Sequence, residues 1–107
     1  MIKVSFFTTE KGLLVGFDIY GHADYGKHGY DIVCAAVSSA AFLVVNTISE
    51  IIKVSANVRV SDFGAMYMKI NENDASLCKD ILLGLKLHLL NLEEQYPENI
   101  TVNYVEV

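Results

Sequence analysis

The segment Tyr20–Ser39, YGHADYGKHGYDIVCAAVSS, decides how the rest of the chain is interpreted. Its first half contains three glycines and two histidines without a hydrophobic pattern, which predicts a loop. Its second half opens at Asp31, a residue type that often caps helices, and continues as an apolar run. We therefore predict a loop over residues 21–30, followed by a helix that begins just before Cys34.

Strand patterns precede this loop. Residues 1–8 and 13–20 alternate between two kinds of side chain, as strands with two different faces do. A short turn that ends in Gly12 separates them, so we predict a β-hairpin. After the loop, apolar residues recur at helical spacing from Ile32 to about Lys53, which predicts a long helix.

The second half of the chain repeats this arrangement. Val54–Asp62 and Gly64–Asn71 have strand character, and Asp62-Phe63-Gly64 predicts the turn of a second hairpin. The side chains expected to pair across it are Val58 and Val60 with Met66, Met68 and Ile70. Ile100–Val107 alternates again and predicts a last strand.

A second helix is predicted between the second hairpin and the last strand. Asn73 or Asp74 caps its start, and it continues to about Gln95. Pro97 stops it, because proline has no amide hydrogen and clashes with the preceding turn. The stripe expected to be buried consists of Leu77, Ile81, Leu82, Leu85, Leu89 and Leu92.

The element order ββαββαβ predicts an α+β fold. We expect residues 1–107 to form a single domain, a two-layer sandwich of a mostly antiparallel sheet with two helices packed on one face. The other sheet face would carry the apolar residues Phe7, Leu14, Tyr20, Tyr67, Val105 and Val107. Because small monomers rarely leave so much apolar surface in water, we predict a homodimer, with a substrate or a loop that covers part of this face as the alternative.

Charge and cysteine content exclude several classes of function. The formal net charge is −5, from 8 basic and 13 acidic residues, and the basic residues do not cluster, which disfavours nucleic acid and favours a basic partner. The run Ile32–Val45 is too short to span a bilayer, and the start resembles no signal peptide, so we predict a cytoplasmic protein without membrane contact. Cys34 and Cys78 form no paired motif, so we expect no disulfide, metal or cofactor.

Cys34 is the candidate nucleophile. With Asp31 as the N-cap, it would be the third helical residue, among backbone N–H groups at the positive end of the helix. That position lowers a thiol pKa and favours the reactive thiolate, and the same N–H groups would stabilise an oxyanion. The alternative is a small buried hydrophobic residue within an apolar run.

His22 is the candidate general base, because a strand end anchors it and the loop can return it to the helix start. The alternative is a solvated loop histidine without a role, and His28 is a less well placed base. Asp31 caps the helix, orients the histidine, or opposes thiolate formation, and these three roles remain open. Ser38 follows Cys34 by one helical turn and is a neighbour of the site or a boundary residue.

The loop itself has the composition of a substrate-binding segment. Its glycines permit backbone shapes that other residues resist, and its tyrosines offer aromatic walls. The residues assigned to this substrate loop are Gly21, Tyr25, Gly26, Gly29 and Tyr30. A metal site built from His22, His28 and Cys34 is the alternative, but its spacing matches no standard zinc pattern.

Two motifs together resemble one known family. Gly21-His22-Ala23 and, after the glycine-punctuated loop, Asp31–Ser38 (DIVCAAVS) are similar to the Prp family of ribosomal-processing cysteine proteases, and the likeness extends to length and element order. The resemblance implies an endopeptidase that removes a short N-terminal extension from a bacterial large-subunit ribosomal protein, the twenty-seventh in the standard series. It further implies cleavage after an aromatic pair, a Cys34–His22 dyad and a dimer.

Two hypotheses follow. In the first, the chain is a cysteine endopeptidase acting on the extension of a basic ribosomal protein. In the second, it is a non-catalytic ribosome-assembly module that holds the same tail and needs only the loop and an apolar face. Reactivity of Cys34 separates them, because only an activated thiol reacts well below its free pKa of about 8.5.

Overall fold

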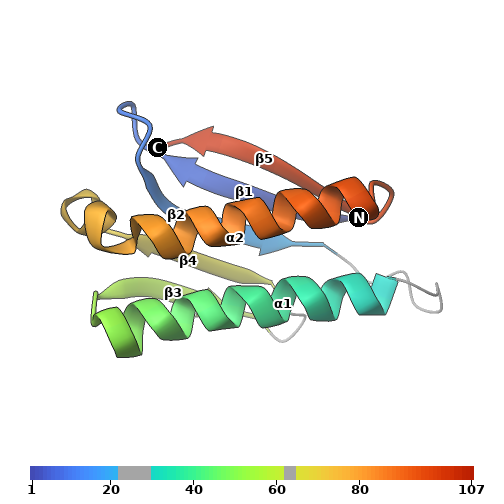
Figure 1. The fold of residues 1–107 in the computed structure, drawn as a ribbon, viewed down its shortest axis with the longest axis horizontal. Coiled ribbons are helices and arrows are strands. Elements are labelled where there is room, and N and C mark those ends of the chain that lie inside the picture. The colour runs from blue at the N-terminus through green and yellow to red at the C-terminus, as the bar shows by residue number, and fades with distance from the viewer. Residues whose placement is uncertain (22–29, 62–64) are drawn as a thin grey trace.

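Five strands and two long helices form in the order ββαββαβ within residues 1–21, 30–61 and 65–107, which the computed structural model describes (Figure 1). Of Tyr30 and Asp31 only the backbone is described, and residues 62–64, where the sequence predicts a turn, lie outside the described residues. The strands are β1 (Ile2–Thr8), β2 (Leu14–Tyr20), β3 (Ala56–Val60), β4 (Met66–Ile70) and β5 (Ile100–Glu106). The helices are α1 (Tyr30–Asn46) and α2 (Ala75–Gln95). The predicted order and the α+β class are confirmed.

The strands make one mixed sheet in the order β3-β4-β2-β1-β5. The pairs β1–β2, β2–β4 and β3–β4 are antiparallel, whereas β1 and β5 are parallel. The parallel pair arises because α2 carries the chain back along the sheet before β5 begins. The prediction of a mostly antiparallel sheet is therefore confirmed.

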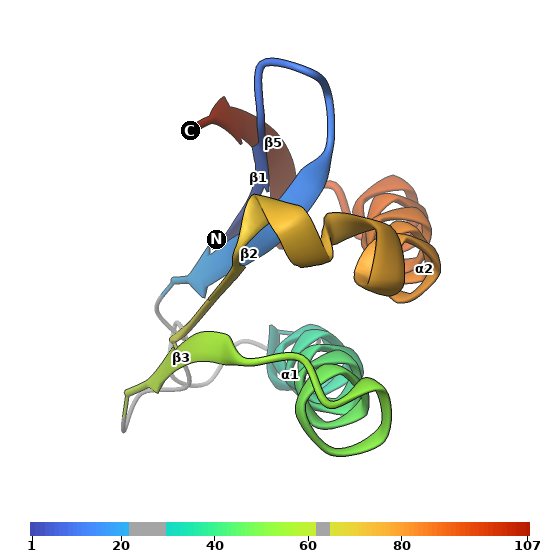
Figure 2. The ribbon, with the colours of Figure 1, turned by 90° about the vertical axis from the view of Figure 1, so that its left-hand side faces the viewer.

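Both helices cover the same face of the sheet, so the molecule has two layers (Figures 1 and 2). The core lies between them, because alternate residues of each strand point toward the helices. Its largest fully buried side chains include Phe6, Phe17, Ile48, Met68, Leu82, Leu89 and Ile100. Burial of each such side chain contributes about 1.5–3 kcal/mol to folding before the entropy cost is subtracted.

The first helix begins earlier than the sequence analysis placed it. α1 starts at Tyr30, so Asp31 lies inside the first turn and the prediction of Asp31 as N-cap is wrong. The helix continues as a π-helical segment, Thr47–Ile52, and ends at Lys53, which has a left-handed φ of 63°. The N–H groups of Lys53 and Val54 both donate to the carbonyl oxygen of Ile48, which explains the predicted end.

The second helix follows a short 3₁₀ turn, Glu72–Asp74. Asp74 occupies the N-cap position as predicted, but the side-chain cap is made by Asn71, whose Oδ1 accepts the Asn73 N–H at 2.9 Å. The predicted stripe is confirmed at Leu82, Leu85, Leu89 and Leu92, and Ile81 is half-buried. Leu77 was wrongly included, because Cys78 and not Leu77 is in phase with Leu82, Leu85 and Leu89.

The sheet face away from the helices carries the predicted apolar residues. Phe7, Leu14 and Tyr67 are half-buried, whereas Tyr20, Val105 and Val107 are exposed. The rings of Phe7 and Tyr67 meet with centroids 5.5 Å apart, and the Arg59 guanidinium lies 5.2 Å from the Tyr67 centroid. Side chains on this face therefore cover one another in part.

One side-chain hydrogen bond joins the second helix to the last strand. Glu93 of α2 accepts the backbone N–H of Val102 in β5 through Oε2, at 2.6 Å. A charged acceptor makes such a bond stronger than a neutral one. It fixes the C-terminal half of α2 to the strand at the edge of the sheet.

Candidate active site

The chain leaves the sheet at Gly21, the first residue of the predicted substrate loop. Gly21 has a φ of 149°, a conformation that side chains rarely adopt. A β-carbon there would overlap the Met1 carbonyl oxygen and lie 2.8 Å from the Cα of Ile2. The loop therefore begins pressed against the start of β1, and only glycine fits at that point.

Cys34 is the fifth residue of α1, where the sequence analysis had placed it third. It is half-buried and packs against the edge of the hydrophobic core. Only the first turn of a helix has N–H groups without an intrahelical partner, and Cys34 lies beyond that turn, so its own N–H is not among them. Helical side chains tilt toward the N-terminus, however, so the thiol is directed back over the first turn and its positive potential.

The structure describes one predicted neighbour of Cys34, Ser38, in full and the other, Asp31, by its backbone alone. Ser38 is half-buried and lies one turn farther along the same side of α1. Asp31 and Tyr30 belong to the first turn by their backbone, one turn before Cys34.

The remaining predicted site residues lie outside the described residues. They are His22, Tyr25, Gly26 and Gly29. The structure therefore brings together Cys34, Ser38 and the first turn of α1, and the pairing of Cys34 with His22 stays a prediction. Among the described residues, no group of three or more His, Cys, Asp and Glu has the arrangement of a metal site.

The second cysteine has a different environment. Cys78 is the fourth residue of α2 and is fully buried. Burial raises its thiol pKa, and the nearby carboxylate of Asp74 raises it further. Both cysteines are described, and no disulfide joins them. Cys78 therefore behaves as a small core residue.

The sequence analysis missed an apolar strip at the edge of the sheet. Val58 and Val60 pair with Met68 and Met66 as predicted, and both methionines are buried. The two valines are nevertheless 37% and 51% exposed, because β3 is an edge strand that the helices do not fully cover (Figure 2). No signal in the sequence shows this exposure, because the place of β3 at the end of the sheet does not follow from a single sequence.

A match to a family model decides which class of protein this chain belongs to. The model of the family described as "Cysteine protease Prp" matches residues 1–101. The chain belongs to the Prp family of cysteine proteases. It is a cysteine protease involved in ribosomal processing, so the family resemblance drawn from the two motifs is confirmed.

Individual relatives in the Prp family agree over nearly the full length. The ribosomal processing cysteine protease Prp of Staphylococcus aureus is 33% identical over 97% of this chain and 99% of its own. That of Bacillus subtilis is 30% identical over 87% of each. The likeness therefore includes both helices and all five strands found in the described residues.

Solved Prp structures share the fold. The essential ribosomal processing protease Prp from Staphylococcus aureus, in complex with a substrate peptide, matches with a TM-score of 0.88 and 30% identity over 98% of this chain and 100% of that one. A second structure of the Staphylococcus aureus protein, with a covalently linked product peptide, gives 0.85 and 31% over the same shares.

Proposed function

We propose that this protease uses Cys34 as nucleophile and His22 as general base to remove the N-terminal extension of the twenty-seventh large-subunit ribosomal protein. The observation that carries the proposal is the half-buried Cys34 near the start of α1, in a chain that matches the cysteine-protease family from residue 1 to residue 101. The family match also disfavours the non-catalytic binding module, because such a module needs no thiol at this position.

The chemistry follows from a thiolate at this end of the helix. His22 takes the thiol proton, and the Cys34 sulfur attacks the scissile carbonyl carbon, which becomes a tetrahedral oxyanion. Backbone N–H groups of the first turn of α1 stabilise that charge. The imidazolium then protonates the leaving amine as the C–N bond breaks, which leaves a thioester.

Water completes the cycle. The imidazole of His22 accepts a proton from water, whose oxygen attacks the thioester carbonyl, and the C–S bond breaks to regenerate the thiolate and release a carboxylic acid. Asp31 and Ser38 act as neighbours that position the nucleophile, and Gly21, Tyr25, Gly26, Gly29 and Tyr30 form the loop that holds the peptide.

Charge and apolar surface support the choice of substrate. The net charge of −5 attracts a basic ribosomal protein. A hollow of about 600 Å³ is lined by Glu93, Glu94 and Pro97 at the C-terminal end of α2. That end lies at the same end of the molecule as the start of α1 (Figure 1). The exposed valines of β3 supply apolar surface for the aromatic pair that precedes the cut.

We also propose that the protein works as a homodimer in the cytoplasm, without contacts to nucleic acid or membrane. A chain of 107 residues that exposes many large apolar side chains supports association.

The test compares two histidines of the same loop. His22→Ala lowers the rate of cleavage of the extended ribosomal protein by about 10²–10⁴-fold, because the proton acceptor is lost. His28→Ala is the matched control and keeps a rate close to that of the wild type. The readout is the mass of the substrate over time, with circular dichroism to confirm folding. Equal effects of the two changes, or an effect of His28→Ala alone, contradict the assignment of His22.

A further inference from the structure

A polar hollow lies at the end of the sheet opposite to Cys34. Its volume is about 660 Å³, and it forms where β1 and β4 end and where β2 and β3 begin (Figure 1). The molecule is 43 Å long, and α1 begins at the other end of this axis (Figure 1). The hollow is therefore separate from the candidate active site.

The wall of the hollow is rich in hydrogen-bond donors. Hydroxyl groups, side-chain amides and an ammonium group all donate, whereas a carboxylate only accepts. Apolar lining comes from Val15, Ile70 and Val107. The polar side chains of the wall are those of Thr9, Ser55, Asn57, Lys69, Asn71 and Glu72. Because donors outnumber the one carboxylate, this wall suits a ligand whose groups mainly accept hydrogen bonds.

Thr9 is the buried member of this wall. Its exposed fraction is 8%, and it is the one buried polar residue in the part of the chain that the structure describes. Its Oγ1 accepts the Leu13 N–H at 3.2 Å, but within the described residues nothing accepts its own hydroxyl hydrogen. A buried donor without an acceptor costs about 1–3 kcal/mol. The hydroxyl of Thr9 therefore has a hydrogen bond to give to a molecule in the hollow.

Lys69 supplies the positive charge of the hollow. It is half-buried near the end of β4, and no ion pair joins it to a carboxylate of the described residues. Asn57 lies beside it, because the two residues are partners in the β3–β4 pair. Its partner on the other side is Gly16 of β2, which has no side chain to cover it. The Lys69 ammonium and the Asn57 amide can therefore reach the same ligand.

The sheet face that carries Lys69 is the basic side of an acidic chain. Lys3, Arg59 and Lys69 all project from this face, because each alternates along its strand with residues that face the helices. Among the described strand residues of the face, Asp18 is the only acidic one. In a chain of net charge −5, this side is where an anion is attracted.

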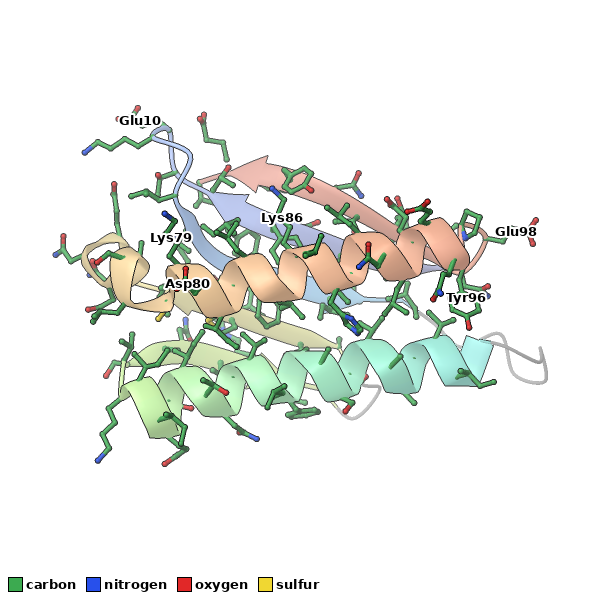
Figure 3. All side chains as sticks on the ribbon, viewed as in Figure 1. Glu10, Lys79, Asp80, Lys86, Tyr96 and Glu98 are labelled. Carbon is green, nitrogen blue, oxygen red and sulfur yellow. The ribbon has the colours of Figure 1, made fainter. Side chains whose placement is uncertain are left out.

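Two carboxylates near the hollow restrict which anions fit. Glu10 follows Thr9, but it is exposed on the β1–β2 turn, which projects beyond the sheet (Figure 3). Glu72 lines the hollow itself. It repels a ligand that is anionic throughout, but it accepts hydrogen bonds from an ammonium or hydroxyl group. The wall therefore favours a ligand with an anionic group at one end and a donor at the other.

We propose that this hollow binds a small molecule that carries one anionic group, a phosphate monoester or a carboxylate, together with an ammonium or hydroxyl group. Lys69, Asn57 and the Thr9 hydroxyl donate to the anionic group, and Glu72 accepts from the other end. The proposal goes beyond the protease activity and does not rest on it, because the hollow and Cys34 lie at opposite ends of the molecule.

The test adds three probes to the wild-type chain and follows backbone amide resonances by NMR. The probes are O-phosphoethanolamine, glycylglycine and ethanolamine. At least one of the first two shifts the resonances of Thr9, Asn57 and Lys69 saturably, with a Kd of about 1 mM or tighter. Ethanolamine lacks the anionic group and causes no saturable shift. The tighter of the two anionic probes shows whether the site prefers phosphate or carboxylate.

Two substitutions remove donors of the hollow with little change of shape. Lys69→Met keeps an unbranched side chain without the charge and weakens binding by at least about tenfold. Thr9→Val keeps the volume without the hydroxyl and weakens binding about three- to tenfold. Lys3→Met is the matched control, because it removes the same charge from the same sheet face outside the hollow, and it keeps the Kd within about twofold of the wild type. Circular dichroism checks the fold of each variant.

Three results overturn the proposal. If neither anionic probe shifts the resonances of Thr9, Asn57 and Lys69 saturably, the hollow is not a binding site for this class of ligand. If Lys69→Met and Lys3→Met weaken binding equally, the anion is attracted to the basic face in general. If ethanolamine binds as tightly as O-phosphoethanolamine, Glu72 alone holds the probe. None of these results bears on Cys34, whose role is tested by cleavage of the ribosomal protein.

Discussion

The two cysteines lie near the starts of the two helices, Cys34 as the fifth residue of α1 and Cys78 as the fourth residue of α2, but they differ in burial. Cys34 is half-buried near the start of α1 and packs against the core. Cys78 is fully buried in α2, and burial together with Asp74 raises its pKa. The same side chain is therefore suited to nucleophilic attack in one helix and to packing in the other. Access to solvent makes the difference, because both cysteines lie about one turn from the start of their helix.

The largest expected effect is on cleavage. Cys34→Ala lowers the rate of peptide-bond hydrolysis by at least about four orders of magnitude, because the sulfur that forms the thioester is removed. Cys78→Ala changes the rate by less than about threefold, because a protonated, buried thiol takes no part in the reaction. The measurement is single-turnover cleavage of the extended ribosomal protein. A Cys34→Ala protein that still cuts at the normal rate excludes the proposed nucleophile.

The next largest effect is on alkylation. At neutral pH iodoacetamide modifies Cys34 at least about a thousandfold faster than Cys78, since exposing a core residue costs several kcal/mol and each 1.36 kcal/mol is a factor of ten. Peptide mass spectrometry after timed quenching measures the alkylated fraction of both cysteines in one sample. In denaturant the two rates become similar, which is the internal control. Comparable rates in the folded protein would show that Cys78 is accessible and remove the contrast.

The smallest effect is on stability and its dependence on pH. Cys78→Ala lowers the free energy of unfolding by about 1–2 kcal/mol at pH 7, because it leaves a cavity in the core. The raised pKa of the folded Cys78 thiol gives stability that is complete below the unfolded value of about 8.5 and is lost as the pH rises above it. Urea unfolding at pH 7 and pH 10 therefore shows a smaller difference between wild type and Cys78→Ala at pH 10. An unchanged or larger difference contradicts the assigned shift.

The fold was predictable because each element has its own local pattern. The alternation of residues 1–8 and 13–20 and the capping and proline signals of α2 depend on neighbours in sequence, and the structure confirms them. The prediction placed Leu77 in the buried stripe, whereas Cys78 is the residue that is buried. Both are apolar and adjacent, so only packing against the sheet decides between them. The parallel pairing of β1 and β5 depends on contacts between the two ends of the chain, which no local pattern encodes.

The candidate site was predictable in its residue types and less so in its geometry. Cys34 and Ser38 lie on one side of α1, as the spacing of four residues predicts. The structure starts α1 at Tyr30, whereas the prediction started it at Ile32. The sequence leaves this open, because an aspartate suits the first turn of a helix as well as its cap. The exposure of Val58 and Val60 was missed, since it follows from the place of β3 in the sheet order.

The hydrogen bond from the Val102 N–H to Glu93 has a consequence for the behaviour of the protein in a crowded cell. β5 is an edge strand, and an edge strand with open backbone donors is a template on which another chain can add a strand. Glu93 occupies one of those donors, and its charge remains beside the edge. A strand that pairs there must first displace the carboxylate and bury it. At this position of β5, the backbone donor is therefore not open to a strand of another chain.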